Sequence, residues 1–412
     1  MSYMIDNPSD AQLANRIAAV VMILMAIGTV FVFSASTSLG QQLDLDRFFE
    51  YQGLRQMVFF PLALLVMLVV GSLDHRKLSL TNGILRSLTT YLVAASVVLL
   101  ILVWIPKLGV EKNSARRWLQ IPLGATSLTF QPSELAKWSM ICFVAAVCQM
   151  NGFQLHCFWR QMAPLLAVAG VVVGLILIED FGTAAFVAML VFLMLLVGGA
   201  QWWHLVSPLP LAMGGFLAAL FLSPYRLQRV LAFRDPEKWA DSVGYQANQS
   251  LIAIGSGGLV GKGLGGGICK YGHLPEDTTD FVFAIIGEEL GLVGAIAVIG
   301  LFILFVWLGL QVVLRCKDEF SRLLATGIVL AIGVQAALNI GVVTVVLPTK
   351  GIPLPFVSGG GTSLLLSAAA VGVLLSIARR STKDSLEVSM DSLCADRGHL
   401  ARSIPAECFS SR

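Results

Sequence analysis

The chain alternates long apolar runs with shorter polar segments. About 20 mostly apolar residues are needed to cross the hydrocarbon core of a bilayer as a helix. Ten runs suit this purpose, at 14–36, 56–72, 86–106, 134–150, 163–179, 181–199, 202–222, 282–313, 322–347 and 360–379. The pattern therefore predicts an all-α integral membrane protein, a polytopic bundle of about ten transmembrane helices.

Two of the apolar stretches allow more than one interpretation of how they form helices. The stretch 163–199 contains two helices if the chain breaks at Asp180-Phe181-Gly182; one long helix there would give nine in all. The run 282–313 is longer than a bilayer requires, so we expect one end to project or the helix to tilt.

The composition supports the membrane assignment and excludes other classes of protein. Of the 412 residues, 56% are hydrophobic and 13% are charged, whereas soluble domains carry about 25% charged residues. These values exclude a soluble cytosolic enzyme, a disordered chain and a nucleic-acid-binding protein. The 7 cysteines are too scattered for a disulfide framework, and the sequence contains no CxxC or HExxH motif that would indicate a metal site.

Basic residues in the short connections indicate the orientation of the bundle. Those on the side of the termini are Arg76, Lys77, Arg315, Lys317, Arg322, Arg379 and Arg380. Short loops rich in Lys and Arg stay in the cytoplasm, so we predict that both termini are cytoplasmic. The predicted parts are a cytoplasmic tail at 1–13, a transmembrane domain at 14–380 with an extracytoplasmic loop at about 223–281, and a disordered cytoplasmic tail at 381–412.

The segments predicted to face outward also carry cations. These segments are 107–133, 223–281 and 348–359, and their basic residues include Arg117, Arg226, Arg229 and Lys350. Long loops can cross the membrane regardless of their charge, so these cations do not contradict the predicted orientation. Their number on one face indicates an anionic ligand at the outer face. The loop 223–281 contains apolar stretches and aromatic residues, so we expect it to be ordered.

The end of this long loop contains a glycine-rich stretch followed by an aspartate at a helix start. The glycines between Gly255 and Gly267 predict either a flexible, tightly turning loop or a backbone that approaches a substrate closely. Asp280 falls in the first turn of the eighth helix, where the helix dipole favours an anion. It is therefore either a helix-start carboxylate or a base that takes a proton from a hydroxyl at the membrane surface.

Acidic residues inside apolar runs are costly and are either paired or functional. We expect that one of Glu288 and Glu289 pairs with a buried cation or amide. The alternative is a direct contact with substrate. Glu134 and Lys137 are three residues apart on one helix face, so the sequence predicts an ion pair between them.

Two further polar residues lie where the apolar pattern is interrupted. Asp180 stands at a helix break, where it either caps a buried helix end or lines a cavity. Lys350 lies between the last two apolar runs, where it either extends to the membrane interface or meets a phosphate as a point charge.

These segments, taken in order, resemble a known family. They are Ala115-Arg116-Arg117-Trp118, Gln131-Pro132-Ser133-Glu134, Asp180-Phe181-Gly182-Thr183, Pro224-Tyr225-Arg226, Gly244-Tyr245-Gln246, the glycine-rich stretch, Leu274-Pro275-Glu276, Thr279-Asp280-Phe281, Gly287-Glu288-Glu289-Leu290-Gly291, Asn339-Ile340-Gly341 and Pro355-Phe356-Val357-Ser358. The set resembles the SEDS proteins (shape, elongation, division and sporulation), which polymerise bacterial peptidoglycan. Pro348-Thr349-Lys350-Gly351 is similar to the cell-division branch, because the elongation branch usually lacks that lysine. Gly359 departs from the family, which usually has a tyrosine there.

The resemblance implies an inverting glycosyltransferase that acts on lipid II, the undecaprenyl-pyrophosphate-linked disaccharide-pentapeptide. The family's essential external aspartate maps onto Asp280, which would act as the general base for an attacking sugar hydroxyl. The substrate-binding candidates are Lys350, Arg226, Arg229, Arg117 and Ser358. The supporting polar residues within the membrane would be Glu134, Lys137, Asp180, Glu288 and Glu289.

The resemblance also implies partners and a location. The partners would be lipid II, the nascent lipid-linked glycan, a class B penicillin-binding protein that cross-links the strand, and other divisome membrane proteins, with no nucleic acid. The location would be the bacterial cytoplasmic (inner) membrane at the division septum, with the active site on the outer face. A divalent cation, Mg or Mn, could assist the leaving group, although no cofactor is visible in the sequence.

Three rival functions remain open at this point. A lipid II flippase or other transporter would also have broken helices and intramembrane carboxylates. A non-catalytic division scaffold and an elongation-type polymerase are the other two. A base at Asp280 on the outer face distinguishes a polymerase from a flippase, which has no need of one.

Overall fold

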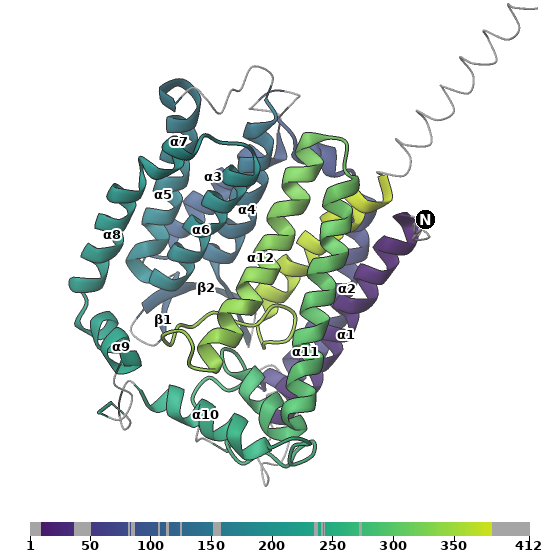
Figure 1. Ribbon diagram of the computed structural model, residues 1–412, viewed down its shortest axis with the longest axis vertical. Helices are drawn as coiled ribbons and strands as arrows, with labels where there is room; N and C mark the ends of the chain where they lie inside the picture. The colour runs from purple at the N-terminus through teal and green to yellow at the C-terminus, as the bar shows by residue number, and fades with distance from the viewer. Residues whose placement is uncertain are drawn as a thin grey trace, which may run out of the picture.

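The computed structural model is a bundle of helices that stand side by side, with a few short elements near one end (Figure 1). It describes residues 10–36, 51–80, 83, 87–105, 108–112, 115–123, 126–150, 158–234, 238–239, 242, 244–271 and 274–380. The first helix begins at Asp10, inside the N-terminal tail predicted at 1–13. The rest of that tail and the C-terminal tail predicted at 381–412 lie outside the described residues.

Helices occupy all the apolar runs predicted from the sequence. They are α1 (Asp10–Ser36), α2 (Gln52–Ser72), α3 (Leu88–Leu102), α4 (Pro132–Cys148), α5 (Ala163–Glu179), α6 (Phe181–Val197), α7 (Trp202–Val206), α8 (Leu209–Phe221), α11 (Val282–Arg315), α12 (Glu319–Val343) and a final helix, Gly361–Arg380. A 3-10 turn, η2 (His75–Leu78), precedes α3, and a π-helical turn, η4 (Phe158–Met162), precedes α5. Within the described residues, 7 helical segments are long and apolar enough to cross a membrane. The protein is therefore a multi-pass membrane protein.

The outer surface of the bundle suits lipid rather than water. No residue of α8 is buried, and Leu211 on this helix is 82% exposed. So much exposed apolar surface would favour aggregation in water, whereas lipid tails cover it without cost. The start of α1 and the end of the final helix lie at the same end of the bundle, as an even number of crossings requires (Figure 1).

Much of the described part of the long loop predicted at 223–281 is helical. It contains α9 (Pro224–Arg234) and α10 (Tyr245–Gly257), which lie at the end of the bundle opposite to the termini (Figure 1). Both helices are amphipathic or polar enough to rest on the end of the bundle instead of crossing the membrane. The described residues 258–271 and 274–281 form turns between α10 and α11.

The stretch 163–199 forms two helices that meet at Asp180, so the interpretation with a break is confirmed. Asp180 ends α5 and caps α6: its Oδ1 accepts a hydrogen bond from the Thr183 N–H (3.1 Å) and its Oδ2 from the Thr183 hydroxyl (2.9 Å). This is the usual way in which a side-chain oxygen satisfies the first amides of a helix. The break brings a carboxylate to the polar end of the bundle.

The long helix α11 is broken inside its sequence, at Gly291. This residue has φ 67° and ψ −163°, a conformation available to glycine without strain, and the helix therefore changes course there. The glycine-rich stretch fills the break. Main-chain hydrogen bonds connect Lys262 N–H to Glu288 O (3.0 Å), Gly263 N–H to Glu289 O (2.9 Å) and Leu292 N–H to Gly258 O (2.9 Å). The glycines permit a close approach of this stretch to the broken helix.

Gly261 provides a test of this arrangement. A Cβ on Gly261 would lie 2.2 Å from Glu289 O, and its φ of +84° is unfavourable for other residues. We expect Gly261→Ala to destabilise the protein by about 1–3 kcal/mol or more, measured by thermal unfolding in detergent. Gly255→Ala is the matched control, because a Cβ there meets nothing within 4 Å. Equal melting temperatures for the two variants would contradict the proposed packing.

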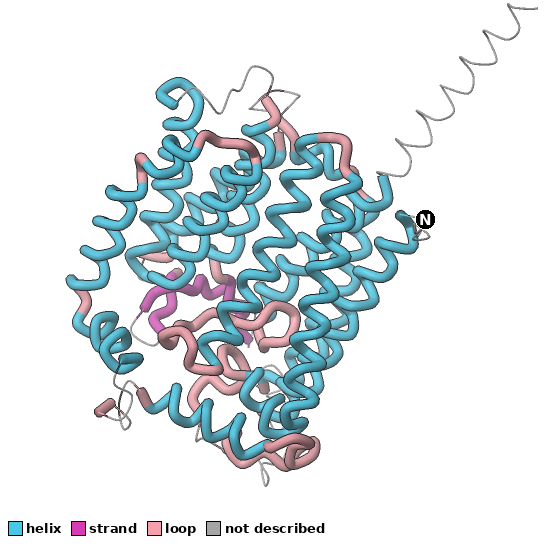
Figure 2. The backbone as a smooth tube through the Cα atoms, in the orientation of Figure 1, coloured by secondary structure: helices cyan, strands magenta, loops and turns pink. Residues whose placement is uncertain are grey.

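A small antiparallel sheet lies in the segment 107–133, which the all-helical prediction left as a loop. Its strands are β1 (Gly109–Lys112), β2 (Ala115–Leu123) and β3 (Thr126–Phe130), in the order β1-β2-β3 (Figure 2). In the register of β2 and β3, Leu119 lies opposite Phe130. The sheet leads directly into α4 and carries Arg117 toward the interior of the polar end.

Candidate functional site

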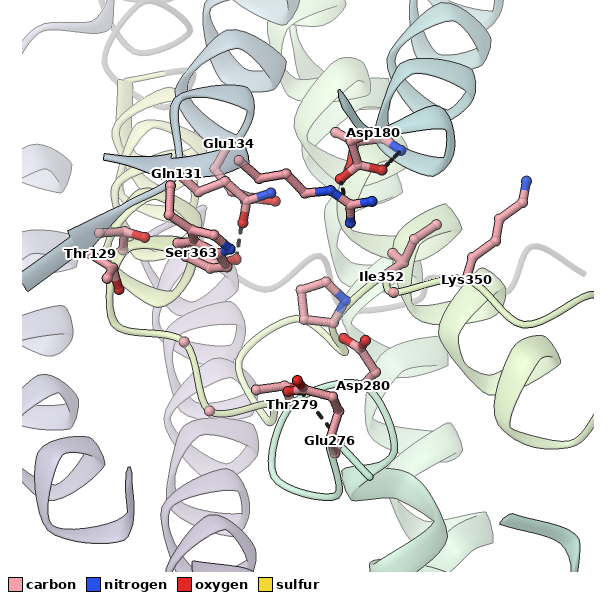
Figure 3. Close-up of a pocket in the computed structure, with 18 of the residues that line it drawn as sticks. Thr129, Gln131, Glu134, Asp180, Glu276, Thr279, Asp280, Lys350, Ile352 and Ser363 are labelled. Atoms are coloured by element: carbon pink, nitrogen blue, oxygen red, sulfur yellow. Dashed lines mark hydrogen bonds and ion pairs between the residues drawn. The ribbon is translucent and has the colours of Figure 1, made fainter. Parts of the chain in front are cut away.

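A polar cavity of about 400 Å³ lies at the end of the bundle that contains the sheet (Figure 3). Its wall is built by β2, the starts of α2, α4 and α6, by α9, and by the loops that precede α11 and the final helix. Of the residues predicted for the site, it brings together Asp280, Lys350, Arg117, Arg229, Asp180 and Glu134.

Asp280 is held in the cavity wall through its main chain. The Asn339 side-chain amide, on α12, donates to the carbonyl oxygens of Asp280 (2.8 Å) and Ile352 (2.7 Å). Ser358 Oγ donates to Thr279 O, the residue before Asp280, and accepts from the Leu354 N–H at 2.8 Å. These bonds connect the Asp280 loop to the loop before the final helix while leaving the Asp280 carboxylate available to the cavity.

Gly351 leaves space for this carboxylate. A Cβ at Gly351 would come within 2.8 Å of Asp280 Oδ2, closer than any real contact of this kind. Asp280 is partly exposed, and the space to which it is exposed is the cavity. A ligand in the cavity can therefore reach the carboxylate oxygens.

The surroundings make Asp280 a weaker acid than usual. Burial is the main cause, followed by the negative charges of Glu276 and Asp180, while Arg117 and Arg229 act in the opposite direction; together they raise the pKa of Asp280 to about 7. A carboxyl with a pKa near neutrality both exists as the ionised base and retains affinity for a proton. The site is thus suited to proton abstraction at neutral pH.

Three cations of the cavity are held by main-chain or aromatic contacts. Arg117 donates from Nε to Glu179 O (3.0 Å), and its Nη1 lies 3.5 Å from Asp180 Oδ2. Arg229 donates to Thr349 O at 3.4 Å. Lys350 Nζ lies 5.3 Å from the centroid of the Phe181 ring, and its side chain extends away from Asp280 (Figure 3). Burial lowers the pKa of Lys350, with Asp180 opposing the shift.

Comparison with known proteins agrees with this geometry. Residues 14–383 match the model of the FTSW_RODA_SPOVE family, which is described as 'Cell cycle protein'. The chain belongs to this family. The SEDS resemblance of the sequence motifs is therefore confirmed, and the match extends beyond those motifs to the first helices of the bundle.

Individual members of the FTSW_RODA_SPOVE family are similar over most of their length. The chain is 38% identical over 362 residues to a probable peptidoglycan glycosyltransferase FtsW of Coxiella burnetii (86% of this chain, 93% of the relative). It is 34% identical over 365 residues to the stage V sporulation protein E of Bacillus subtilis (88% and 96%).

Two solved structures of this family share the fold. One belongs to a peptidoglycan synthase complex described as coordinating polymerization and crosslinking; its TM-score is 0.69 at 30% identity, with 89% of this chain and 97% of that chain covered. The other is the rod shape determining protein RodA of Thermus thermophilus, with a TM-score of 0.61 at 28% identity and coverage of 92% and 98%.

Two residues predicted to bind substrate in this family member lie elsewhere. Arg226 donates to the carbonyl oxygens of Ile178 (2.9 Å) and Ala219 (3.2 Å), at the ends of α5 and α8, and does not line the cavity. Ser358 is buried and connects the two loops described above. In this structure both side chains hold the backbone around the site.

Gly359, which departs from the family pattern, lines the cavity. Its N–H donates to Thr278 O at 2.8 Å, next to the Ser358 contact. A Cβ at this position would lie 3.0 Å from Thr278 O and 3.2 Å from Val32 Cγ1, so it would point toward α1. The hydrogen bond of the backbone is thus made without a tyrosine ring.

The predicted ion pair between Glu134 and Lys137 is present and almost completely buried. Lys137 Nζ lies 2.8 Å from Glu134 Oε2 and 2.9 Å from Gln335 Oε1, and the Ser363 hydroxyl donates to Glu134 Oε2 at 3.1 Å. The Gln335 amide in turn donates to Pro353 O at 2.9 Å. This network forms the floor of the cavity and connects α4, α12 and the final helix.

Glu288 and Glu289 are both paired with lysines, as expected for at least one of them. Lys262 Nζ lies 2.7 Å from Glu288 Oε1, and Lys270 Nζ lies 2.9 Å from Glu289 Oε1. The Ser34 hydroxyl of α1 donates to Glu289 as well, at 2.9 Å. Neither glutamate lines the cavity, so their location supports the pairing alternative: they fasten the glycine-rich stretch to the break in α11.

A divalent metal does not fit the described residues well. Within them, no three His, Cys, Asp or Glu side chains come close enough together to hold an ion. Three of the cavity carboxylates have partners in the protein: Asp180 contacts Arg117 and the start of α6, Glu134 contacts Lys137, and Glu276 accepts from the Thr279 hydroxyl. Asp280 is the fourth, and its carboxylate faces the cavity.

The structure adds cavity residues that the sequence alone did not single out. They are Arg55, Gln52, Gln246, Glu276, Gln335 and Thr349. Arg55 directly precedes the apolar run predicted at 56–72, where an arginine is indistinguishable from an ordinary interface anchor. Gln246 and Glu276 belong to motifs on which the family resemblance rests. That membership was the only indication in the sequence that these two residues belong to the site.

Proposed function

We propose that this chain is a peptidoglycan glycosyltransferase that polymerises lipid II into β-1,4-linked glycan strands. The observation that carries the proposal is Asp280, an ionisable carboxyl fixed by its main chain in a polar cavity that Arg117, Arg229 and Lys350 also line. Relatives that match 87% and 86% of the chain are named probable peptidoglycan glycosyltransferases, and those names support the same activity.

The proposed reaction has one bond-making and one bond-breaking event. The C4 hydroxyl of the acceptor sugar attacks the anomeric carbon of the lipid-linked donor glycan, and its proton passes to Asp280. The bond from the anomeric carbon to the pyrophosphate oxygen breaks, and both of its electrons leave with undecaprenyl pyrophosphate. Attack from the opposite face converts the α link to a β-1,4 link. General base assistance of this kind contributes about 10²–10⁴-fold to a rate.

The cations on the α6 wall have a natural role in this reaction. Negative charge grows on the pyrophosphate as it leaves, and fixed positive groups stabilise that charge in the transition state. Arg117, Arg229 and Lys350 line the cavity and are held by backbone or aromatic contacts on the same side of it. Lys350 in particular carries its charge without an ion-pair partner among the described residues, which suits a phosphate ligand.

Orientation, partners and location follow as part of the same proposal. The cavity lies at the end of the bundle opposite to the termini, so cytoplasmic termini place it on the outer face, where lipid II is polymerised (Figure 1). The relation to a solved peptidoglycan synthase complex supports a class B penicillin-binding protein as partner. The Lys350 motif and the FtsW relatives support action in cell division, with other divisome proteins, at the septum of the inner membrane.

The direct test uses the purified full-length chain with its transpeptidase partner and labelled lipid II in detergent. Glycan strands on a gel are the expected result, both with and without a chelator. A wild-type protein that makes no strand, but moves labelled lipid II across a liposome membrane, would overturn the polymerase in favour of a flippase. If strands form without the chelator but not with it, a divalent metal takes part in the reaction.

The pKa of Asp280 predicts the pH dependence of strand formation. Only the ionised carboxylate accepts the proton, so the rate should be low in acid, rise with pH, and level off above about pH 7. Glu276→Gln removes a charge that raises this pKa, so the midpoint should move to lower pH; Arg229→Gln should move it to higher pH. Initial rates across neutral pH measure the midpoints. Shifts in the opposite directions would contradict the assignment.

A further inference from the structure

Helix α2 brings one more cation to the cavity, on a wall that the proposed reaction has not used. Arg55 lies in the first turn of α2 and lines the cavity together with Gln52 and Phe59. Residues three and seven apart share one face of a helix. The face of α2 that contains Arg55 therefore looks into the cavity.

Arg55 differs from the other cavity arginines in what it contacts. Its side chain is half-buried, yet within the described residues it makes no side-chain hydrogen bond, ion pair or ring contact. Arg117 and Arg229, by contrast, both donate to carbonyl oxygens. A guanidinium has five N–H donors, and withdrawing it from water without an acceptor is costly. This arrangement favours an anionic ligand as the missing acceptor.

The cavity therefore has cations on two separate walls. Arg117 and Lys350 lie at the junction of α5 and α6, and Arg229, on α9, donates to the carbonyl oxygen of Thr349, next to Lys350. Arg55 stands with α2, which packs on α1, and whose Phe59 touches Gly361 at the start of the final helix. In Figure 1, α2 lies on the side of the bundle near α1 and α11, away from α5 and α8. Two anions could be bound at once without sharing a cation.

We propose that Arg55 binds the diphosphate of the acceptor, the lipid-linked molecule that is not cleaved. The inference rests on the proposed function, because polymerisation brings two lipid-linked diphosphates to one site. The departing diphosphate gains charge and uses the cations near α6. The acceptor diphosphate retains a constant charge, and one planar guanidinium can bind two of its oxygens in a fork. Arg55 thus selects acceptors that still carry a diphosphate.

The first experiment compares two soluble acceptors with one lipid-linked donor, using the full-length protein and its partner. Both acceptors are the disaccharide-pentapeptide; one carries a short prenyl diphosphate and the other an uncharged alkyl group. The wild type should use the diphosphate acceptor with an apparent KM about 10–100-fold lower. In Arg55→Gln this advantage should disappear, with kcat and the KM of the uncharged acceptor retained, and Arg55→Lys should restore part of it.

Arg226→Gln is the matched control, because Arg226 binds carbonyl oxygens outside the cavity. It should leave the ratio of the two KM values at the wild-type level. An Arg55→Gln protein that discriminates as well as the wild type, or that loses kcat with both acceptors equally, would overturn the assignment of Arg55.

A binding measurement separates this inference from the proposed function. The diphosphate acceptor is titrated into Asp280→Asn protein with and without Arg55→Gln, so that no reaction is needed. We expect the second substitution to weaken binding by about 10–100-fold. Equal affinities would refute the role of Arg55 even if strands are made; a weakened affinity would uphold it even if they are not.

Discussion

Replacing Asp280 with asparagine is expected to lower the rate of strand formation by about 10²–10⁴-fold. The amide has nearly the same shape as the carboxylate, but it cannot take the proton of the attacking hydroxyl. The main-chain bond from Asn339 to Asp280 O does not involve the exchanged atoms, so the loop should remain in place. Gel analysis of labelled lipid II measures the rate, and binding of lipid II should remain close to that of the wild type.

Asp277→Asn provides the matched control for this prediction. Asp277 belongs to the same turn, and burial raises its pKa to about 6, but it does not line the cavity. Its replacement should leave most of the activity. If Asp280→Asn formed strands at the wild-type rate, or if both variants lost activity equally, Asp280 would not be the base.

Replacing Lys137 with methionine is expected to destabilise the protein by about 3–5 kcal/mol. Lys137 is 1% exposed and is bonded to Glu134 and Gln335. Without it, the Glu134 carboxylate would remain buried, and among the described residues the Ser363 hydroxyl would be its remaining side-chain hydrogen-bond partner. A charge left alone in an apolar interior costs more than the pair itself contributes. Thermal unfolding in detergent should show a clear loss.

The double variant Glu134→Gln with Lys137→Met distinguishes the effect of an unpaired buried carboxylate from the effect of lost packing. It removes both charges while nearly retaining their volumes, so it should recover much of the lost stability. A double variant as unstable as Lys137→Met alone would mean that the methionine disturbs packing, and that the isolated carboxylate is not the problem.

The sequence could predict the membrane helices because a bilayer imposes a simple rule. A spanning segment must be apolar over its whole length, and this property is visible one segment at a time. The break at Asp180 was visible as well, since the sequence Asp180-Phe181-Gly182 separates two apolar runs. The Glu134–Lys137 pair follows from helical spacing alone.

The parts that could not be predicted depend on contacts between distant segments. The strands from Gly109 to Phe130 are short and pair only with one another, so no long periodic pattern announces them. The kink at Gly291 depends on the glycine-rich stretch, which comes earlier in the chain. The Lys262–Glu288 and Gly258–Leu292 hydrogen bonds hold that stretch in the break of the helix. Arg55 has the sequence context of an interface residue, and only the fold shows that it faces the cavity.

Asn339 has a consequence for how the protein can move. One amide group on α12 holds both the Asp280 loop and the Lys350–Ile352 loop. If α12 shifts when a lipid enters sideways between helices, the proton acceptor and the loop that carries Lys350 travel together as one piece. The Ser358–Thr279 and Gly359–Thr278 hydrogen bonds join the Asp280 loop to the same segment, so a bundle that loosens to admit a long prenyl chain keeps the spacing between these two parts of the site.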